Sequence, residues 1–291
     1  MAIASRWDRR SIMKAAGVGA LAAVGGPLAE AHADEEEPLV NGNIKQSVCR
    51  WCYGSIPLEE LAAEAKRIGY QSIELVTPAE FPKVKAAGLT CAMLSGACKI
   101  EDCFNRPDNH DQLEKVLREH IEFAAANGLP NVICFSGNRR GMSDEEGLAN
   151  CAAGLRRIVG FAEQKKVTIC MELLNSKVDH RDYMCDRSPW GVELVKQVGS
   201  PRFKLLYDIY HMQIMEGDVI RTIQENKEYI GHYHTGGNPG RHDIDETQEL
   251  NYAAIVKGIL ATGYEGFLAQ EFIPTRDPLA SLAQGFRICD V

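Results

Sequence analysis

Four side chains that could bind a metal stand where hydrophobic segments of the sequence give way to polar ones. They are Glu172 in CMELLN, Asp208 in LLYDIYH, His234 in GHYHTGG and Glu271 in LAQEFIP. Each of them alone would suit a surface position or a hydrogen-bonded place in the core. Together, two glutamates, one aspartate and one histidine form an oxygen-rich ligand set that suits Mn²⁺ or Mg²⁺, with Co²⁺ or Zn²⁺ as alternatives.

A second histidine, His232, precedes His234 by two residues in the same segment. We expect these two imidazoles to face opposite sides of their strand, so that only one of them reaches the site. His234 is assigned as the ligand because it lies nearer the end of the strand. Tyr207 and Tyr233 flank the ligands and are expected to pack behind the strands.

The rest of the chain shows one repeating pattern of predicted strands and helices, which could bring these distant residues together. Short apolar or β-branched runs, typical of buried strands, alternate with longer helical patterns. The predicted strands are 44–49, 71–76, 89–94, 131–135, 167–173, 203–208, 230–235 and 266–271. The predicted helices are 58–68, 79–86, 110–126, 144–164, 191–198, 219–229, 252–260 and 278–288. Ser143 with Glu146 three residues later is a capping box that starts one of these helices.

Strands that are each followed by a helix, over roughly 250 residues, are typical of a (β/α)₈ TIM barrel of the α/β class. A doubly wound open sheet is the alternative, but no GxGxxG motif follows the first strand. In a barrel the carboxyl ends of all strands share one rim. The four ligand-type residues would therefore converge, and a divalent cation would remove the repulsion and the desolvation cost of three carboxylates held together.

Three stretches of the second half of the chain resemble the hydroxypyruvate isomerase family and, more broadly, the xylose-isomerase-like barrels, which include ketose 3-epimerases. The stretches are YDIYHMQIMEGD at 207–218, GHYHTGGNPGRHDID at 231–245 and QELNY at 248–252. The resemblance extends from about Ile44 to the C-terminus. It implies a (β/α)₈ fold and metal-ligand roles for Glu172, Asp208, His234 and Glu271. The third ligand is commonly Gln in hydroxypyruvate isomerase, so His234 is closer to the epimerase pattern.

The chemistry that the resemblance implies is proton transfer next to a carbonyl, through an enediolate, on hydroxypyruvate or a similar small α-hydroxy carbonyl compound. Glu172 and Glu271 would take the proton and return it. A sugar epimerase with the same chemistry is the first alternative. A periplasmic sugar-binding protein without catalysis is the second. An endonuclease of the apurinic-site type is the third, but it would need more metal ligands and a basic face.

Two further residues are expected to contact the substrate on the loops that follow the ligands. His211 belongs to the Asp-x-x-His that the resemblance marks, and it would donate a hydrogen bond to a substrate oxygen or else cap the next helix. Arg241 would pair with a substrate carboxylate. Its alternative is a salt bridge within the loop to Asp243 or Asp245, and Glu249 would orient Arg241 or close the loop.

Three residues on other loops are weaker candidates for the same pocket. His180 and Lys177 follow the fifth predicted strand and could reach the substrate. Trp51 lies just past the first strand, where it would wall the pocket against water or else lie in the core.

The first 33 residues indicate an export signal rather than a part of the fold. Arg9 and Arg10 open the run DRRSIMK, an apolar stretch covers 15–28, and Ala31-His32-Ala33 is an A-x-A cleavage site. The pattern resembles a twin-arginine signal, so we expect a periplasmic protein, with no membrane anchor in the mature form because the apolar stretch is short. The expected organisation is a signal over 1–33, a linker over 34–43 and one barrel domain over 44–291.

The composition and net charge of the chain indicate which kinds of molecule it could bind. The 291 residues include 32 basic and 40 acidic side chains, for a formal net charge of −8. An acidic surface argues against nucleic acid and against an anionic membrane surface as partners, which leaves a small-molecule substrate. Cys49 and Cys52 form a CxxC without a second pair, so a zinc knuckle is not favoured. The resemblance also implies a homo-oligomer.

Overall fold

Seven parallel strands lie at the centre of the computed structural model, which describes residues 40–291. The strands are β1 (Lys45–Cys49), β2 (Ser72–Glu74), β3 (Asn131–Cys134), β4 (Thr168–Leu173), β5 (Phe203–Asp208), β6 (Ile230–Thr235) and β7 (Phe267–Gln270). They pair in the order β2-β1-β7-β6-β5-β4-β3. The first strand therefore pairs with the last, as it does in a barrel.

The place of an eighth strand, between β2 and β3, is taken by a segment that pairs irregularly. Thr90 forms an isolated parallel bridge to β2, and Leu94 forms another to β3. Between them, side chains hold the backbone of Ala92: its N–H donates to Ser72 Oγ and its carbonyl accepts from Asn131 Nδ2, each at 2.8 Å. The third predicted strand is therefore wrong as a regular strand, because side chains replace part of its ladder. The segment still connects β2 to β3 and continues the barrel.

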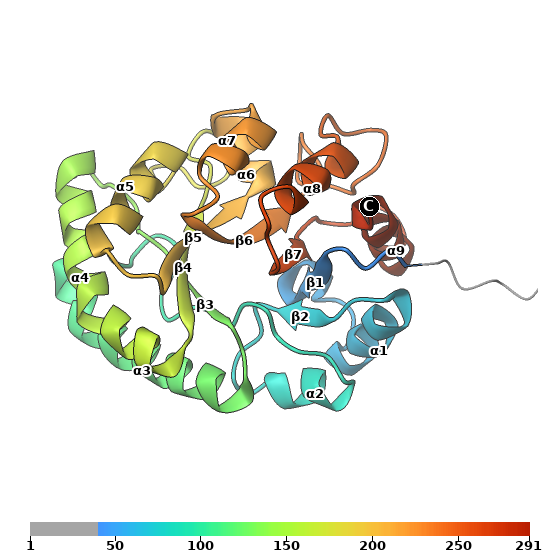
Figure 1. Ribbon diagram of the computed structural model, residues 1–291, viewed down its shortest axis with the longest axis horizontal. Coiled ribbons are helices and arrows are strands. Elements are labelled where there is room, and N and C mark those ends of the chain that lie inside the picture. The colour runs from blue at the N-terminus through green and yellow to red at the C-terminus, as the bar shows by residue number, and fades with distance from the viewer. Residues whose placement is uncertain (1–39) are drawn as a thin grey trace, which may run out of the picture. The chain divides into compact units, whose positions relative to one another are not determined.

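Helices follow the strands and cover the outside of the sheet (Figure 1). They are α1 (Leu58–Ile68), α2 (Phe81–Ala86), α3 (His110–Asn127), α4 (Asp144–Lys165), α5 (Ser188–Val198), α6 (Ile209–Met215), α7 (Val219–Glu225), α8 (Tyr252–Leu260) and α9 (Pro278–Cys289), with 3₁₀ turns at Arg50–Tyr53 and Pro107–Asn109. The predicted helices are all present, 58–68 and 252–260 with the predicted ends and the others with at least one end shifted, and α6 is a helix that the sequence analysis did not include.

Helix α1 shows how the apolar pattern produces the packing. Its buried residues Leu58, Leu61 and Ala65 recur at three- and four-residue spacing and form one face toward the core. The helix ends at Gly69, whose φ of 120° is a conformation that side chains with a Cβ disfavour. A Cβ there would lie 2.8 Å from the ring of Phe286 in α9, so this glycine also lets α1 approach α9 closely.

The start of the described chain is tied to its end. The backbone N–H groups of Asn41 and Gly42 donate to the carboxylate of Asp290 at 2.7 and 2.8 Å. The predicted export signal, 1–33, and residues 34–39 of the predicted linker lie outside the described residues. Within residues 40–291, no helix combines the length and the apolar character that crossing a membrane requires.

The capping box at the start of α4 yields a test of local stability. Ser143 Oγ accepts the N–H of Glu146 at 3.1 Å. We expect Ser143→Ala to lower the free energy of unfolding by about 1 kcal/mol because one N–H of the first turn loses its partner. Ser143→Asp, which keeps an acceptor, should retain most of the stability. Urea unfolding of the three proteins measures this, and an unchanged midpoint for Ser143→Ala would contradict it.

Candidate metal centre

The four residues selected as metal ligands lie together at the carboxyl ends of four adjacent strands. Glu172 is on β4, Asp208 ends β5, His234 is on β6, and Glu271 directly follows β7. All four side chains are buried, and one ligand atom from each lies within 4.8 Å of those of the others. Residues that are up to 99 positions apart in the sequence thus form one cluster because parallel strands end at one rim.

Two cationic groups face the three carboxylates of this cluster. His234 Nδ1 lies 2.6 Å from Glu271 Oε2 and 3.5 Å from Glu172 Oε1. Arg241 Nη2 donates to Glu271 Oε2 at 2.5 Å and to Asp208 Oδ2 at 3.1 Å. The cluster is therefore held together by charge as well as by the fold.

The surroundings of the cluster shift the pKa values of Glu172 and Glu271 in opposite directions. Burial raises the pKa of Glu172, and the nearby charge of Glu271 raises it further. Burial also raises the pKa of Asp208 well above its ordinary value. Burial acts in the same direction on Glu271, but Arg241 and His234 outweigh it and hold the pKa of Glu271 well below the usual range. Glu172 thus holds a proton more readily than Glu271 does.

A further carboxylate, Glu74 at the end of β2, lies behind the cluster and contacts both histidines of β6. Glu74 Oε1 accepts from His232 Nε2 at 2.8 Å and from His234 Nε2 at 2.9 Å. The expectation that His232 and His234 face opposite sides was wrong, because residues two apart on a strand point to the same face. Burial works against an ionised Glu74, but the two histidines outweigh it and lower the pKa of this carboxyl to about 2.

Sequence analysis missed Glu74, although the signal was available. It is the acidic last residue of the short buried strand SIE, and the ligands were found by the same position at a strand end. Its contact with His234 Nε2 leaves Nδ1 of that ring directed at Glu271 and Glu172. A carboxylate that orients an imidazole in this way is the usual support of a metal-binding histidine.

The donor set fits a divalent cation. Glu172 Oε1 is buried and has no hydrogen-bond partner among the described residues, which costs free energy unless a ligand satisfies it. The residues that would hold the ion are Glu172, Asp208, His234 and Glu271, three oxygen donors and one nitrogen donor. The family resemblance and the structure thus select the same residues for this role.

A second group with close ligand atoms, Cys49 with Glu74 and His234, is a weaker candidate for a metal. Cys49 Sγ lies 3.9 Å from His234 Nε2. Burial raises the pKa of the Cys49 thiol well above its ordinary value. Metals bind the thiolate rather than the thiol, so the protonated Cys49 is not favoured as a ligand. We therefore interpret Cys49 and Glu74 as neighbours that contact the His234 ring.

Arg241 contacts neither of the partners that the sequence analysis considered within its loop. Asp243 accepts from Thr275 at 2.9 Å, and Asp245 pairs with Arg276 at 3.3 Å. The alternative of a salt bridge from Arg241 to either aspartate was therefore wrong.

The Arg241 guanidinium lies between two aromatic rings, at 5.1 Å from the ring centre of Trp51 and 5.4 Å from that of Tyr210.

Glu249 is exposed and contacts a different residue from the one proposed. Its carboxylate accepts from Gln213 Nε2 at 3.2 Å. Its backbone N–H donates to the carbonyl of Asn238 at 2.8 Å. The role of closing the loop is thus performed by the Glu249 backbone, and the predicted side-chain contact to Arg241 is absent from the described hydrogen bonds.

His211 is placed to act as a neutral hydrogen-bond donor. Its Nδ1 lies 2.6 Å from the Asn175 amide nitrogen, which donates to it, so Nε2 carries the proton. Burial and the charge of Arg241 lower the pKa of His211 well below its ordinary value. His211 Nε2 is buried without a partner among residues 40–291. The cap of α6 is Asp208, whose Oδ1 accepts the His211 N–H at 3.0 Å, and not the His211 side chain.

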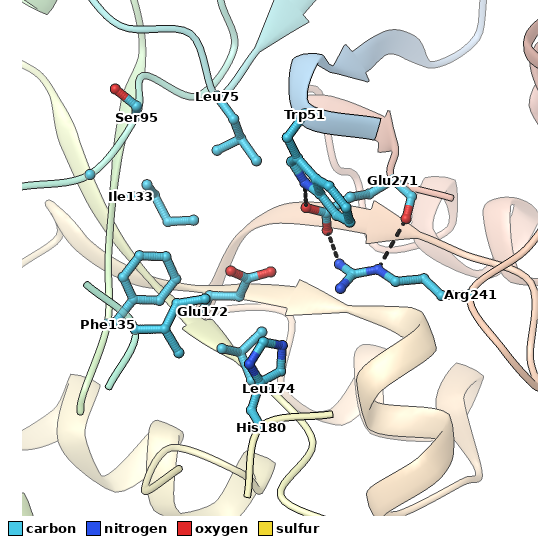
Figure 2. Close-up of a pocket in the computed structure, with 12 residues that line it drawn as sticks. Trp51, Leu75, Ser95, Ile133, Phe135, Glu172, Leu174, His180, Arg241 and Glu271 are labelled. Atoms are coloured by element: carbon cyan, nitrogen blue, oxygen red, sulfur yellow. Dashed lines mark hydrogen bonds and ion pairs between the residues drawn. The ribbon is translucent and has the colours of Figure 1, made fainter. Parts of the chain in front are cut away.

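A cavity of about 410 Å³ opens beside the cluster (Figure 2). Glu172, Glu271 and Arg241 line one side of it, and Trp51 and His180 also line it. Its other large lining side chains form an apolar wall of Leu75, Ile100, Ile133, Phe135 and Leu174. The sequence analysis named none of these five residues, because apolar side chains that line a cavity look the same in sequence as those of the core.

Trp51 and Lys177 differ in their relation to the cavity. The indole N–H of Trp51 donates to Glu271 Oε1 at 2.6 Å, so this ring is both a wall and a support of a ligand. Lys177 is exposed, and its ammonium donates to the carbonyls of Ile214 and Met215 at the end of α6. Lys177 is absent from the residues that line the cavity, so it does not reach the pocket as the sequence analysis proposed.

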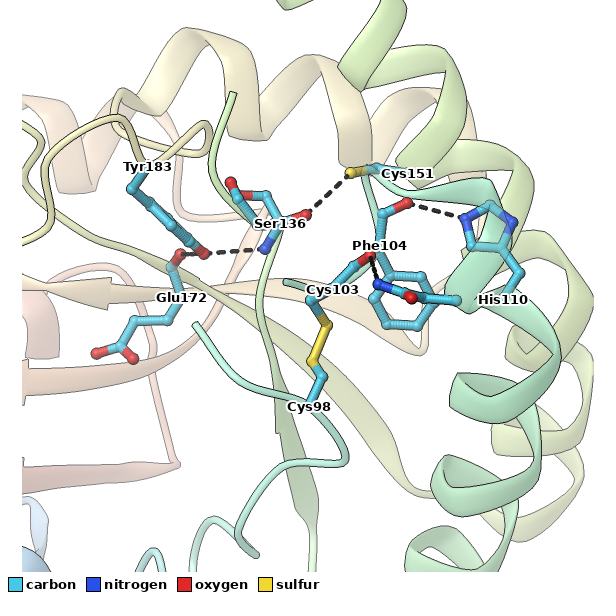
Figure 3. Close-up of a disulfide and its surroundings, with 10 residues drawn as sticks. Cys98, Cys103, Phe104, His110, Ser136, Cys151, Glu172 and Tyr183 are labelled. Carbon is cyan, nitrogen blue, oxygen red and sulfur yellow. Dashed lines mark hydrogen bonds between the residues drawn. A yellow bond between two sulfur atoms is a disulfide. The ribbon is translucent and has the colours of Figure 1, made fainter. Parts of the chain in front are cut away.

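A disulfide and a tyrosine hold the backbone near the apolar wall and near Glu172 (Figure 3). A disulfide between Cys98 and Cys103 closes the loop that carries Ile100 of the apolar wall. Tyr183 donates its hydroxyl to the carbonyl of Glu172 at 2.9 Å and accepts the Ser136 N–H at 3.0 Å. These contacts fix the backbone from which the Glu172 carboxylate extends.

Comparison with known proteins supports the same fold and an isomerase or epimerase family. A family model described as Xylose isomerase-like TIM barrel matches residues 62–289. The 2-oxo-tetronate isomerase of Cupriavidus necator is 28% identical over 240 residues, which cover 77% of this chain and 90% of that protein. The hydroxypyruvate isomerase of Escherichia coli is 28% identical over 177 residues, which cover 60% of this chain and 68% of that protein.

Solved structures share the fold at lower identity. An AP endonuclease of family 2 from Brucella melitensis superposes with a TM-score of 0.75 at 21% identity, covering 83% of this chain and 98% of that one. The 3-keto-D-glucoside 4-epimerase of E. coli superposes with a TM-score of 0.69 at 19% identity, covering 84% of this chain and 100% of that one. At these identities the likeness concerns the fold alone.

The charges of the cluster predict how metal binding depends on pH. Burial disfavours a charged His234, but Glu271 and the other neighbours raise the pKa of this imidazole well above its usual value, so it is protonated at neutral pH. A metal ion needs the neutral imidazole and therefore displaces this proton. We expect Mn²⁺ affinity to rise by about tenfold per pH unit across the neutral range.

Calorimetric titration with Mn²⁺ in buffers of different ionisation enthalpy measures both the affinity and the proton release. Asp208→Asn, which loses a ligand charge inside the same buried volume, should bind Mn²⁺ at least about tenfold more weakly. An affinity that is independent of pH, with no proton released, would contradict the assignment of His234 as a ligand.

Proposed function

This chain belongs to the xylose isomerase-like TIM barrel family, and from that premise we propose that it is a divalent-metal-dependent isomerase of a small α-hydroxy carbonyl compound. Its named relatives are isomerases, which is consistent with an enzyme of the isomerase class. One observation carries the proposal. Two buried glutamates, Glu172 and Glu271, share one cluster with Asp208 and His234 and line a cavity of substrate size.

The reaction moves one proton and no heavy atom. A proton leaves the carbon next to the carbonyl, an enediolate forms, and a proton returns to the neighbouring carbon or to the other face of the same carbon. A divalent cation, when bound, supplies positive charge that offsets the negative charge developing on the substrate oxygens. Glu172 and Glu271 are the carboxyl groups beside the cavity that can take and return the proton.

Other residues of the chain would hold the substrate and exclude water. His211 does not itself line the cavity, but its Nε2, buried and without a partner among the described residues, would donate a hydrogen bond to a substrate oxygen that reaches the cluster. The apolar wall and Trp51 keep water from the reacting carbon, which strengthens charge interactions inside the cavity. Arg241 neutralises Asp208 and Glu271 and can turn toward a substrate oxygen.

Hydroxypyruvate is the first substrate that we propose, with tartronate semialdehyde as the product, because a named relative is a hydroxypyruvate isomerase. A sugar epimerase or isomerase is the second candidate. His234 in the place of the third ligand favours it, and so does a cavity that is larger than a three-carbon acid requires. We also propose that the mature enzyme acts in the periplasm after export by the twin-arginine route, on the basis of residues 1–33.

The proposal predicts that either glutamate is needed for turnover. Glu172→Gln and Glu271→Gln keep the shape of the side chain but remove the proton acceptor, so we expect kcat to fall by at least about 10²-fold. Glu122→Gln, on the exposed side of α3, is the matched control and should retain full activity. Turnover is assayed with hydroxypyruvate, ketohexoses and 3-keto-sugars in the presence of Mn²⁺.

The outcomes separate the classes of function. Full activity of either buried-glutamate variant would contradict the mechanism. Turnover of a sugar but not of hydroxypyruvate would select the epimerase. Tight binding of a panel member with no turnover by the wild-type protein would favour a binding protein on the same barrel.

A further inference from the structure

A second cavity, of about 480 Å³, lies next to the one described above. The two cavities share Trp51, His180 and Arg241 as lining residues, so they meet at these three side chains. The inner cavity is lined by Glu172 and Glu271, whereas the outer one is lined by helix α6 and by segments that follow β1, β4, β6 and β7. The outer cavity is thus continuous with the site but is not needed to hold a small reacting group.

The outer cavity is lined by three of the four large hydrophobic side chains that remain exposed in residues 40–291. Among residues 40–291, the large hydrophobic side chains that remain exposed are Val40, Trp51, Val178 and Ile273. The last three of these line the outer cavity, with exposed fractions of 46%, 63% and 42%. Exposed apolar groups that gather in a concave surface with polar neighbours mark a ligand-binding groove, because covering them removes apolar area from water.

Charge excludes an acidic occupant of this outer cavity. Arg241 is the lone permanently charged cation among the described residues that line either cavity, and Asp208 and Glu271 already neutralise it. Burial and the charge of Arg241 lower the pKa of His180, so this imidazole is neutral. Asp179 adds a carboxylate to the outer lining. A carboxylate or phosphate there would meet no free positive charge.

We propose that the outer cavity is a second subsite, which binds an uncharged apolar substituent attached to the reacting α-hydroxy carbonyl unit. The reacting unit lies in the inner cavity beside Glu172 and Glu271, and the substituent passes Trp51 and covers Val178 and Ile273. This inference rests on the proposed function, because it takes the same reacting centre as given. Among the substrates considered above, it favours an α-hydroxy carbonyl compound with a bulky apolar group over hydroxypyruvate, while the reaction type of the proposed function is unchanged.

The test compares two ketones that differ only in the substituent. One is hydroxyacetone, and the other is the same ketone with a benzyl group on its methyl carbon. Proton abstraction from the hydroxymethyl carbon is followed in D₂O as loss of its NMR signal, with Mn²⁺ present. We expect kcat/KM for the benzyl compound to exceed that for hydroxyacetone by at least about tenfold.

Substitutions of the exposed apolar residues locate the effect. Val178→Ser and Ile273→Ser should each bring the ratio of the two kcat/KM values toward one, because they remove apolar surface that the benzyl group covers. Val40→Ser is the matched control, since Val40 is equally exposed but lines neither cavity. It should leave the ratio unchanged. All three positions are exposed, so the variants are expected to fold.

Each other outcome has a defined meaning. Equal kcat/KM values for the two ketones, with a ratio that Val178→Ser and Ile273→Ser do not alter, would overturn the second subsite and leave the proposed function in place. Exchange of neither ketone by a protein that turns over hydroxypyruvate or a sugar would overturn the second subsite alone, whereas exchange of neither ketone together with no turnover of those substrates would contradict the proposed function itself. A wild-type dimer that Ile273→Ser converts to a monomer in sedimentation, with an unaltered ratio, would assign the apolar surface to self-association and overturn the inference.

Discussion

Three carboxylates buried at one rim impose the constraint to which the rest of the site responds. Glu172, Asp208 and Glu271 are almost fully removed from water, and mutual repulsion makes their ionised forms costly. His234 and Arg241 supply the balancing charge, with contacts of 2.6 Å and 2.5 Å to Glu271. A structure that needed only stability would not keep such a cluster, since apolar residues of similar size would pack there at lower cost. The cluster is therefore explained by a ligand that uses its charge.

The geometry of the barrel brings the four residues of the cluster together. Parallel strands end at one rim, so one residue from each of four strands reaches a common centre without strain. Support comes from neighbouring layers: Glu74 orients His234 from β2, and Tyr183 braces the backbone of Glu172. The apolar wall of the inner cavity disfavours water beside the cluster, and the outer cavity adjoins it at Trp51, His180 and Arg241. Charge, support and shape are thus supplied by different strands and loops.

Much of this arrangement was predictable from local sequence patterns. Apolar periodicity located seven of the strands and all the helices of the described chain except α6, and the rule that function lies at the carboxyl ends of barrel strands selected the four clustered residues. The irregular segment at 90–94 was not predictable, because its pairing depends on the side chains of Ser72 and Asn131, which are distant in sequence. The partners of Arg241 were missed for a related reason, since long-range ion pairs leave no mark on local sequence.

The central claim is that this cluster holds one divalent cation on which catalysis depends. Elemental analysis of the purified protein tests it most directly, combined with activity before chelation, after chelation and after Mn²⁺ is restored. The account predicts about one divalent ion per chain, with activity that is lost on chelation and regained with the metal. Full activity in protein that elemental analysis shows to be metal-free would contradict it.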